Sequence, residues 1–368
     1  MTHSPPGQRV FVTGGAGFIG SRLVRKLQAA KLVTVFDSLH SQVHGPQADF
    51  PIFADNVVCI RGDVCDADAL STAVKQADPD LIIHLAAETG TGQSLDEVQR
   101  YCDVNVMGTA NLLASIDRLP KRSRRFLLSS SRSVYGEGPY RRADGSIIYP
   151  GLRRLDALRH GDFELRDSDG ERLTAAPTGP GTPVQPLSVY ASTKLFQEHL
   201  LLNCSEAKGL EPRILRFQNV YGPGQSLRNP YTGVLSIFSQ QVIDGRTLDI
   251  FEDGAMLRDF VFVDDVVSAC LAALAAEGSF RQPIDIGSGE PTTILAAARM
   301  LIGFLGGHND NYRITGNFRV GDIKSAFADI APAQQILQWA PATSLSEGLR
   351  ALANWAAESN QRLPPAGT

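Results

Sequence analysis

Cysteine is scarce in this sequence, and its five residues are scattered without a CxxC pair. They are Cys59, Cys65, Cys102, Cys204 and Cys270. Cysteines placed in this way provide neither the paired ligands of a zinc knuckle nor a disulfide framework, and they are typical of a reducing compartment. We therefore expect a cytoplasmic protein without a metal site.

Long apolar runs and an excess of charge of either sign are also missing. No apolar run approaches the ~18–20 residues needed to span a bilayer, and residues 1–7 contain no apolar segment of a secretory signal. The formal net charge of −4 gives no electrostatic reason to expect nucleic acid or an anionic membrane as a partner. We expect a soluble protein that holds any anionic ligand with local positive groups.

The first half of the chain does contain a regular alternation of strand and helix patterns. Short apolar or β-branched runs predict strands at 9–13, 33–36, 57–60, 80–85 and 125–129, and apolar residues at helical spacing predict a helix at 18–29. Nearly continuous apolar strands separated by helices indicate a parallel sheet that is covered on both faces. The predicted class is therefore α/β, with a doubly wound parallel sheet.

The texture of the sequence changes after Tyr221, where glycine, proline and asparagine become frequent. Such a stretch marks departure from a regular sheet. We expect a nucleotide-binding domain over residues 1–218 and a smaller α/β substrate lobe over 219–368. The chain is expected to cross back to the first domain around 242–275.

A glycine cluster over residues 14–20, GGAGFIG, follows the first predicted strand and opens the first helix. Glycines let the backbone turn tightly and approach a pyrophosphate, which the free N–H groups of a helix N-terminus stabilise. Asp37 follows 17 residues after Gly20, at the end of the second strand, where a carboxylate binds a ribose 2′-OH and repels a 2′-phosphate. Although the cluster alone could be a plain tight turn, this spacing predicts a Rossmann-type site for NAD rather than NADP. The predicted cofactor residues here are Gly14, Gly17, Phe18, Ile19, Gly20 and Asp37.

Two more segments extend the predicted NAD site. Asp63 and Val64 follow the third strand and could reach the adenine edge, whereas Ala86 and Ala87 leave the fourth strand where small residues allow backbone to lie beside a cofactor. His84 lies inside the apolar fourth strand, and we interpret it as a buried structural histidine rather than a catalytic one.

Tyr190 and Lys194 give the sharpest chemical signal. Their i, i+4 spacing puts both side chains on one helix face, with Ser188 as a plausible N-cap. The free phenol has a pKa of ~10, and a nearby ammonium can lower that value by a unit or more. Taken alone, this spacing would indicate an ordinary pair of side chains on the surface of a helix. The serine-rich run Ser129–Ser133 changes this reading, because it ends the fifth strand at the edge where parallel sheets bind ligands.

These motifs, together with the run RFQNVYG over residues 216–222, resemble the extended short-chain dehydrogenase/reductase family of nucleotide-sugar epimerases and dehydratases. The resemblance extends from Val10 to about Trp355. It implies that Tyr190 removes the proton of a sugar hydroxyl while hydride passes to NAD, that Lys194 binds the nicotinamide ribose, and that Ser131 hydrogen-bonds the reacting oxygen. The substrate residues that it implies are Thr91, Ser131, Ser133, Asn219, Arg258 and Arg319, the last three on the diphosphate. Each of these arginines could instead form a surface salt bridge.

The resemblance also narrows the reaction. Family 4,6-dehydratases place two acidic residues after the Ser/Thr, but here those positions are Arg132 and Ser133. This favours 4-epimerisation through a transient 4-keto sugar, with NAD regenerated in each cycle. Segments 87–94, 216–226 and 229–238 resemble the dTDP-L-rhamnose 4-epimerases within the family, so a dTDP-6-deoxyhexose is the expected substrate. A UDP-hexose or UDP-N-acetylhexosamine 4-epimerase is the alternative. A non-catalytic NAD-sensing protein is a more remote one, since such proteins lack the Tyr–Lys pair.

Two features concern assembly. Ser131 and Tyr190 lie further apart than is usual in the family, and segment 140–183 between them is rich in charge, glycine and proline. Long loops of this kind are usually functional or disordered, so a lid over the sugar and a dimer arm are both open. The resemblance further implies a homodimer through a four-helix bundle of segments 103–119 and 188–203. The apolar positions expected there are Val106, Leu112, Leu113, Phe196 and Leu200.

Overall fold

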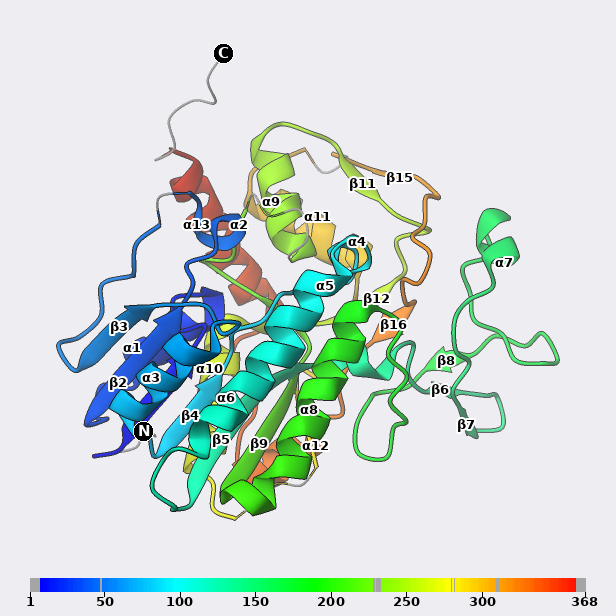
Figure 1. The fold of residues 1–368 in the computed structure, drawn as a ribbon. Coiled ribbons are helices and arrows are strands. Elements are labelled where there is room, and N and C mark those ends of the chain that lie inside the picture. The colour runs from blue at the N-terminus through cyan, green and yellow to red at the C-terminus, as the bar shows by residue number, and fades with distance from the viewer. Residues whose placement is uncertain are drawn as a thin grey trace.

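The computed structural model describes residues 7–361, except for 47, 228, 230–232, 279, 281, 309 and 310. Its centre is a seven-stranded sheet with strand order β13-β9-β5-β4-β1-β2-β3, in which every neighbouring pair is parallel (Figure 1). The strands are β1 (Arg9–Thr13), β2 (Leu32–Asp37), β3 (Val57–Arg61), β4 (Leu81–His84), β5 (Arg124–Ser131), β9 (Leu210–Phe217) and β13 (Ile284–Ile286). The five predicted strands agree with β1 to β5 to within two residues, which confirms the predicted fold class.

Helices cover both faces of this sheet, and the alternation of side chains along β1 shows why its sequence is apolar throughout. Val10 and Val12 join one buried core and Phe11 joins the other, because successive side chains of a strand point to opposite faces. The first core is closed by α1 (Phe18–Lys26), α10 (Val263–Ala275) and α12 (Ala331–Leu337). The second is closed by α3 (Ala67–Ala77), α6 (Gly108–Ile116) and α8 (Val189–Lys208).

A third core lies beyond the end of the sheet where β2 and β4 lead into the short helices α2 (Ser41–His44) and α4 (Gln93–Asp96) (Figure 1). Its helices are α9 (Val234–Ile243), α11 (Ile294–Phe304) and α13 (Leu345–Gln361). Its strands are β10 (Asn219–Tyr221), β11 (Leu248–Ile250), β12 (Leu257–Phe262), β14 (Pro291–Thr293), β15 (Tyr312–Ile314) and β16 (Ser325–Ala326). Strand β12 is its hub, since it pairs with β10, β14 and β16.

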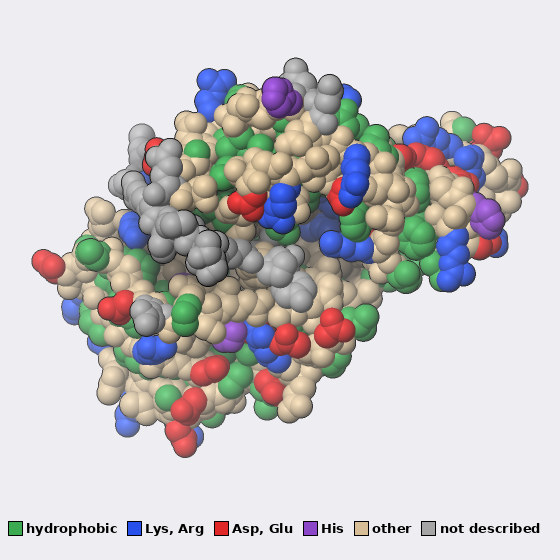
Figure 2. Space-filling model, turned by 90° about the horizontal axis from the view of Figure 1, so that it is seen from above, with side chains coloured by type: hydrophobic (Ala, Val, Ile, Leu, Met, Phe, Trp, Pro, Cys, Tyr) green, Lys and Arg blue, Asp and Glu red, His purple; other side chains and the backbone are tan. Residues whose placement is uncertain are grey.

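Segment 140–183 forms a small antiparallel sheet of order β7-β6-β8, and is called the insertion below. It contains β6 (Tyr140–Arg141), β7 (Ile147–Ile148), α7 (Leu155–Arg159) and β8 (Thr174–Ala175), and Tyr140, Leu165 and Leu173 form its own core. The insertion protrudes from the body with a surface of mixed charge (Figures 1 and 2). A parallel bridge from Thr178 to Ala328 joins its end to the C-terminal part of the chain.

The helix expected at 103–119 begins as a π-helical turn, η1 (Cys102–Met107), and continues as α6. The expectation that Leu112 and Leu113 belong to a dimer face is wrong, because both are buried within their own subunit against α3. Phe196 is exposed, whereas Val106 and Leu200 are half-buried. None of the described helices combines the length and apolar character needed to cross a bilayer.

Candidate active site

A cavity of about 770 Å³ opens at the carboxyl ends of the central strands, within the size range of small-molecule sites. All of the predicted cofactor residues line it: Gly14, Gly17, Phe18, Ile19, Gly20, Asp37, Asp63, Val64, Ala86, Ala87, Tyr190 and Lys194. The structure therefore brings together residues that are up to 180 positions apart in the sequence.

The glycine turn after β1 is built for close approach. Gly14 has φ +71, and a Cβ atom there would lie 2.6 Å from the backbone nitrogen of Ala86. A Cβ at Gly20 would lie 2.2 Å from the carbonyl oxygen of Gly14. Helix α1 begins after Gly17, which provides no side-chain cap for its first N–H groups. This cradle of free amides and absent side chains fits the pyrophosphate of a dinucleotide.

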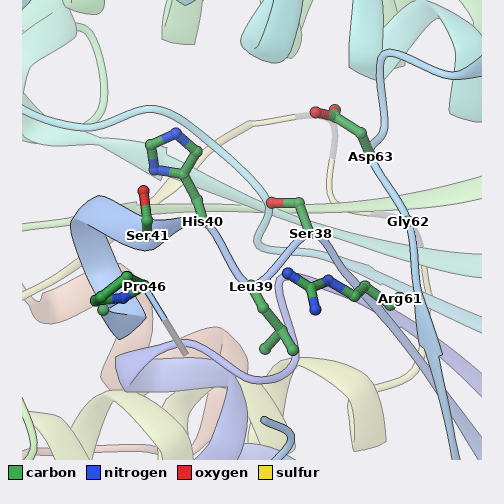
Figure 3. A pocket seen from close by; sticks show the side chains of 9 residues that line it. Ser38, Leu39, His40, Ser41, Pro46, Arg61, Gly62 and Asp63 are labelled. Atoms are coloured by element: carbon green, nitrogen blue, oxygen red, sulfur yellow. The ribbon is translucent and has the colours of Figure 1, made fainter. Parts of the chain in front are cut away.

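Asp37 is held in place at the end of β2. Its carboxylate accepts hydrogen bonds from the backbone N–H groups of Ala16 and Leu39, both at 2.9 Å, and the side chain is buried. Asp37 lines the cavity, and its remaining lone pairs can accept hydrogen bonds from ribose hydroxyls. A second hollow of about 400 Å³ adjoins this point and has four lining residues in common with the main cavity, Ser38, His40, Gly62 and Asp63 (Figure 3). The site therefore extends past Asp37.

The reacting centre joins α8 to the end of β5. Ser188 caps α8 by accepting a hydrogen bond from the N–H of Ala191 at 3.1 Å. The Tyr190 ring packs edge-on against Tyr101, with 6.4 Å between the ring centroids. Ser131 ends β5 and hydrogen-bonds Tyr190, which lowers the pKa of the phenol. The strand and helix thus deliver a hydroxyl and a phenol to one point of the cavity.

The charges at this centre differ from those expected. Burial is the largest influence on Tyr190 and raises its pKa, while Ser131 and the positive charge of Arg132 oppose it. The expected fall in the pKa of Tyr190 is therefore wrong for this structure, because desolvation of the phenolate outweighs its partners. Burial also lowers the pKa of Lys194 to about 7, against the opposing charge of Glu198. The positive charge that favours the Tyr190 phenolate is therefore that of Arg132, not the expected charge of Lys194.

A buried ion pair lies directly behind these groups, and the sequence reasoning missed it. Glu198 accepts two hydrogen bonds from the guanidinium of Arg216, at 2.9 and 2.6 Å, and one from Ser130. Glu198 stands four residues after Lys194, on the same face of α8. That i, i+4 spacing was a signal in the sequence that could have identified it.

His84 has the structural role expected of it. The ring is buried, its Nδ1 lies 2.7 Å from the Thr13 hydroxyl, and its Nε2 lies 2.9 Å from that of Thr109. Burial lowers the pKa of His84 to about 3, so the ring is neutral at physiological pH.

Four of the predicted substrate residues, Thr91, Ser131, Ser133 and Asn219, line the cavity. Ser133 Oγ and Asn219 Oδ1 are buried and have no hydrogen-bond partner among the described residues. Because buried polar atoms are rarely left unpaired, these two fit polar groups of a ligand.

The other two, Arg258 and Arg319, do not line the cavity. Arg258 is buried and donates to the carbonyl oxygens of Leu257 and Ile323, at 2.8 and 3.0 Å, and to the carboxylate of Asp322 at 3.1 Å. Arg319 is exposed and lies 5.1 Å above the centre of the Phe251 ring. Neither guanidinium lines the cavity in this structure, and a contact of Arg258 and Arg319 with a diphosphate stays a prediction.

Arg132 lines the cavity instead, and the sequence reasoning treated it only as a missing acid. No hydrogen bond or ion pair joins its guanidinium to another described residue. Burial and the charge of Arg258 lower the pKa of Arg132 to about 10, which leaves it positive at neutral pH.

A Rossmann-type sheet, a glycine cradle and a serine hydroxyl beside a tyrosine on a YxxxK helix define a dinucleotide-dependent enzyme that moves a proton and a hydride. Comparison with known families agrees. The model of the NAD dependent epimerase/dehydratase family matches residues 10–150 and 169–287. The chain belongs to this family, and its cofactor is NAD.

The relatives are nucleotide-sugar enzymes. A dTDP-L-rhamnose 4-epimerase of Burkholderia thailandensis is 41% identical, with 97% of each chain covered. A UDP-glucose 4-epimerase of Mycolicibacterium smegmatis is 32% identical, with 93% of this chain and 96% of the relative covered. Among solved structures, the UDP-glucose 4-epimerase of Thermotoga maritima with UDP-glucose has a TM-score of 0.76 at 28% identity and covers 95% of this chain and 99% of its own.

Proposed function

We propose that this protein is an NAD-dependent 4-epimerase of a nucleotide-activated sugar, with a dTDP-6-deoxyhexose such as dTDP-L-rhamnose as its substrate. The observation that carries the reaction type is the environment of Tyr190. Ser131 and Tyr190 can exchange a proton with a sugar hydroxyl, but the two positions after Ser131 are Arg132 and Ser133 and offer no carboxylate for an elimination. Oxidation and re-reduction at one carbon need no such carboxylate.

The residues divide the work as follows. When bound, NAD supplies the hydride acceptor and donor for C4 of the sugar. Tyr190 accepts the proton of the C4 hydroxyl and later returns it, while Ser131 holds the same oxygen by a hydrogen bond. Lys194, which lines the cavity, would bind the nicotinamide ribose, and Ser133 and Asn219 would offer the substrate polar atoms that are unpaired among the described residues. Inversion requires the 4-keto sugar to rotate within the site, so that hydride returns to the opposite face of C4.

The nucleotide and sugar follow from similarity. The relative at 41% identity acts on dTDP-L-rhamnose by its name, and this supports a dTDP-sugar here. A UDP-hexose is the second candidate, because the Thermotoga maritima neighbour has UDP-glucose bound and shares the fold over 95% of this chain.

The organisation that we propose has an NAD-binding domain up to residue 218 and a nucleotide-sugar lobe from 219, with α10 and β13 packed on the first domain. Five free cysteines support a cytoplasmic location, and carbohydrate biosynthesis is the process that such a reaction serves. Exposed apolar side chains on η1 and α8 support a homodimer.

The test is direct. Purified protein is incubated with dTDP-L-rhamnose, UDP-glucose, UDP-galactose or UDP-N-acetylglucosamine, and the configuration at C4 is determined by NMR. We expect inversion with dTDP-L-rhamnose, and deuterium placed at C4 should stay at C4 because hydride does not exchange with water. Loss of water from the sugar would identify a dehydratase, and inversion of the UDP-sugars alone would favour the second candidate.

A further inference from the structure

Glu252, in the turn between β11 and β12, is an unusual residue in two respects. Its φ is +54, a conformation that non-glycine residues rarely adopt, and the side chain is only 1% exposed. Its N–H donates to the Asn317 carbonyl at 2.7 Å, which ties the turn to the segment before Arg319. A buried carboxylate needs a compensating partner, and none of these backbone bonds provides one.

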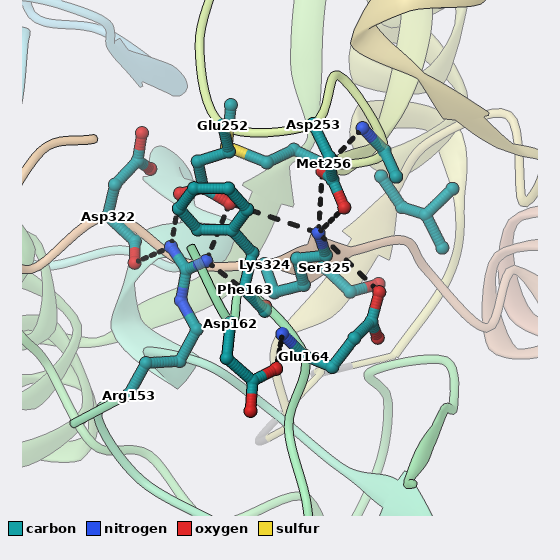
Figure 4. Close-up of polar contacts among 12 residues, drawn as sticks. Arg153, Asp162, Phe163, Glu164, Glu252, Asp253, Met256, Asp322, Lys324 and Ser325 are labelled. Atoms are coloured by element: carbon teal, nitrogen blue, oxygen red, sulfur yellow. Dashed lines mark hydrogen bonds and ion pairs between the residues drawn. The ribbon is translucent and has the colours of Figure 1, made fainter. Parts of the chain in front are cut away.

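That partner comes from the insertion. Arg153, between β7 and α7, donates two parallel hydrogen bonds to Glu252, both at 2.7 Å, and its side chain is 3% exposed (Figure 4). One of the same nitrogens also donates to the Asp322 carbonyl at 2.9 Å. The next residue, Arg154, is 82% exposed and, within the described part of the chain, pairs only with Asp156 on the surface. A single arginine therefore joins the insertion to two loops of the third core.

Segment 322–325 is fixed from other directions as well. Glu137 accepts the N–H groups of Lys324 and Ser325, at 2.9 and 3.1 Å. The ammonium of Lys324 donates to Asp253 at 2.9 Å and lies 3.9 Å from Glu164 of the insertion (Figure 4). The segment is thus held by the chain after the serine run, by the turn before β12, and by the insertion.

This clamped segment stands beside the wall of the cavity. Arg258 donates to Asp322 and to the Ile323 carbonyl. Strand β16, which begins in this segment, pairs with β12 at Leu257 and Arg258, and β12 pairs with β10, whose Asn219 lines the cavity. The charges of Arg258 and Asp322 also act on Arg132. Arg132 in turn lines the cavity and acts on Tyr190. A shift of Asp322 would therefore change the charge and shape that a sugar diphosphate meets next to the reacting centre.

We propose that Arg153 is a positioning residue, through which the insertion supports the nucleotide-sugar site from outside the cavity by holding segment 322–325 and Arg258. The proposal rests on the proposed function and gives the insertion a role in substrate binding. A bidentate, buried ion pair holds both ends rigidly, whereas a lid that opens in each cycle would have to separate two charges inside the protein.

The test compares Arg153→Met with the matched surface variant Arg154→Met. Binding of dTDP and UDP is measured by calorimetry, and NAD content is measured after denaturation. The kinetic constants kcat and KM are determined with the nucleotide sugar that the wild type inverts. For Arg153→Met we expect Kd and KM to rise about tenfold, the size of one lost charge-assisted contact, with kcat changed less than about threefold and NAD content unchanged. Hydrogen exchange should accelerate in both the insertion and segment 322–325. Arg154→Met should behave as wild type.

Wild-type Kd and KM in Arg153→Met would overturn the proposal. Because that variant leaves the buried Glu252 carboxylate with the Lys324 ammonium, 3.9 Å away, in place of two hydrogen bonds from Arg153, it can fail to fold. The double variant Arg153→Met with Glu252→Met removes both charges, and such replacements of buried pairs are commonly tolerated. The double variant should fold, keep NAD and show the raised KM, and a normal KM would again overturn the proposal. A wild-type protein that binds neither dTDP nor UDP would instead refute the proposed function, on which this proposal rests.

Discussion

Tyr190 is the residue on which the proposed chemistry depends most directly. Tyr190→Phe keeps the ring and its packing on Tyr101 but removes the group that accepts the proton. Turnover should fall by about 10²–10⁴, the usual contribution of a general base, while NAD content and the fold are retained. Steady-state assays and analysis of the released dinucleotide check this. Ser131→Ala should reduce turnover less, and a Tyr190→Phe enzyme of near-normal rate would exclude the mechanism.

Arg132 gives the reaction a testable pH dependence. Its positive charge favours the phenolate of Tyr190, so Arg132→Met should raise the pKa of that phenol further. Because the deprotonated form is the base, the rise of kcat with pH should move to higher pH and the rate at neutral pH should fall. Arg132→Lys keeps a charge and should show a smaller shift. An unchanged pH profile in Arg132→Met would contradict this role.

Lys194 should cost stability as well as serve catalysis. Burial lowers its pKa to about 7 from an ordinary 10.5, so between these values the unfolded chain binds more protons than the folded one. The free energy of unfolding therefore rises with pH across this window. Below pH 7 the buried lysine is charged and lowers the free energy of unfolding by its full amount, on the order of a few kcal/mol. Lys194→Met should be inactive yet more resistant to urea at pH 6, with the difference shrinking towards pH 10. Both proteins are compared after removal of the dinucleotide, and a variant that is less stable at pH 6 would refute the argument.

The residues that the sequence identified are those whose function depends on local spacing. The glycine turn, Asp37, Tyr190 and Lys194 each follow from a motif within one strand–helix unit. The resemblance also singled out Arg258, but its surroundings could not be predicted, because they depend on the Asp322 carboxylate and the carbonyl groups of Ile323 and Lys324, which only the fold brings near β12.

At the scale of elements, the contact between β1 and α1 can be tested at Gly20. An added Cβ would lie 2.2 Å from the Gly14 carbonyl oxygen, so Gly20→Ala should displace α1 and reduce NAD content sharply. Gly303→Ala is a matched control inside α11, since nothing lies within 4 Å of a Cβ there. It should retain NAD and be as stable as wild type or more so, by up to about 1 kcal/mol. Dinucleotide analysis and thermal unfolding measure both, and equal NAD content in the two variants would contradict the close fit.

The elements missed from the sequence have physical reasons in common. Strand β9 contains Pro212 and the fully buried Arg213, whose guanidinium bonds the Ala273 carbonyl at 3.0 Å and stacks on Phe280. A buried charge that finds its partners on α10 breaks the apolar pattern by which central strands are predicted. Strand β13 has three residues, too few for a pattern. The two-residue strands of the insertion depend on pairing with one another.

At the scale of the whole molecule, elements that are consecutive in the sequence alternate between the first and the third core. Residues of the third core come from β10 to β12, from α11 and again from α13, while α10, β13 and α12 between them pack with the first core. The composition change near Tyr221 marks the first of these crossings. The later return of the chain to the first core depends on which apolar surface a helix packs against, and the pattern of residues along the sequence does not specify that surface.

The surface formed by η1, α8 and α5 (Val98–Tyr101) carries the last prediction, a homodimer. Met107 is 52% exposed and Phe196 49%, so apolar groups remain on the helices that the family resemblance assigns to the bundle, and Val98 is exposed on the neighbouring α5. Burying such a stripe against its symmetry mate removes it from water. Light scattering at micromolar concentration should therefore give twice the mass of the chain. Met107→Glu with Phe196→Glu should give monomers, because like charges would face each other across the two-fold axis. Ile52→Glu, at an exposed apolar residue outside these helices, should leave the dimer intact. A monomeric wild type, or a double variant that stays dimeric, would show that this surface is not the interface.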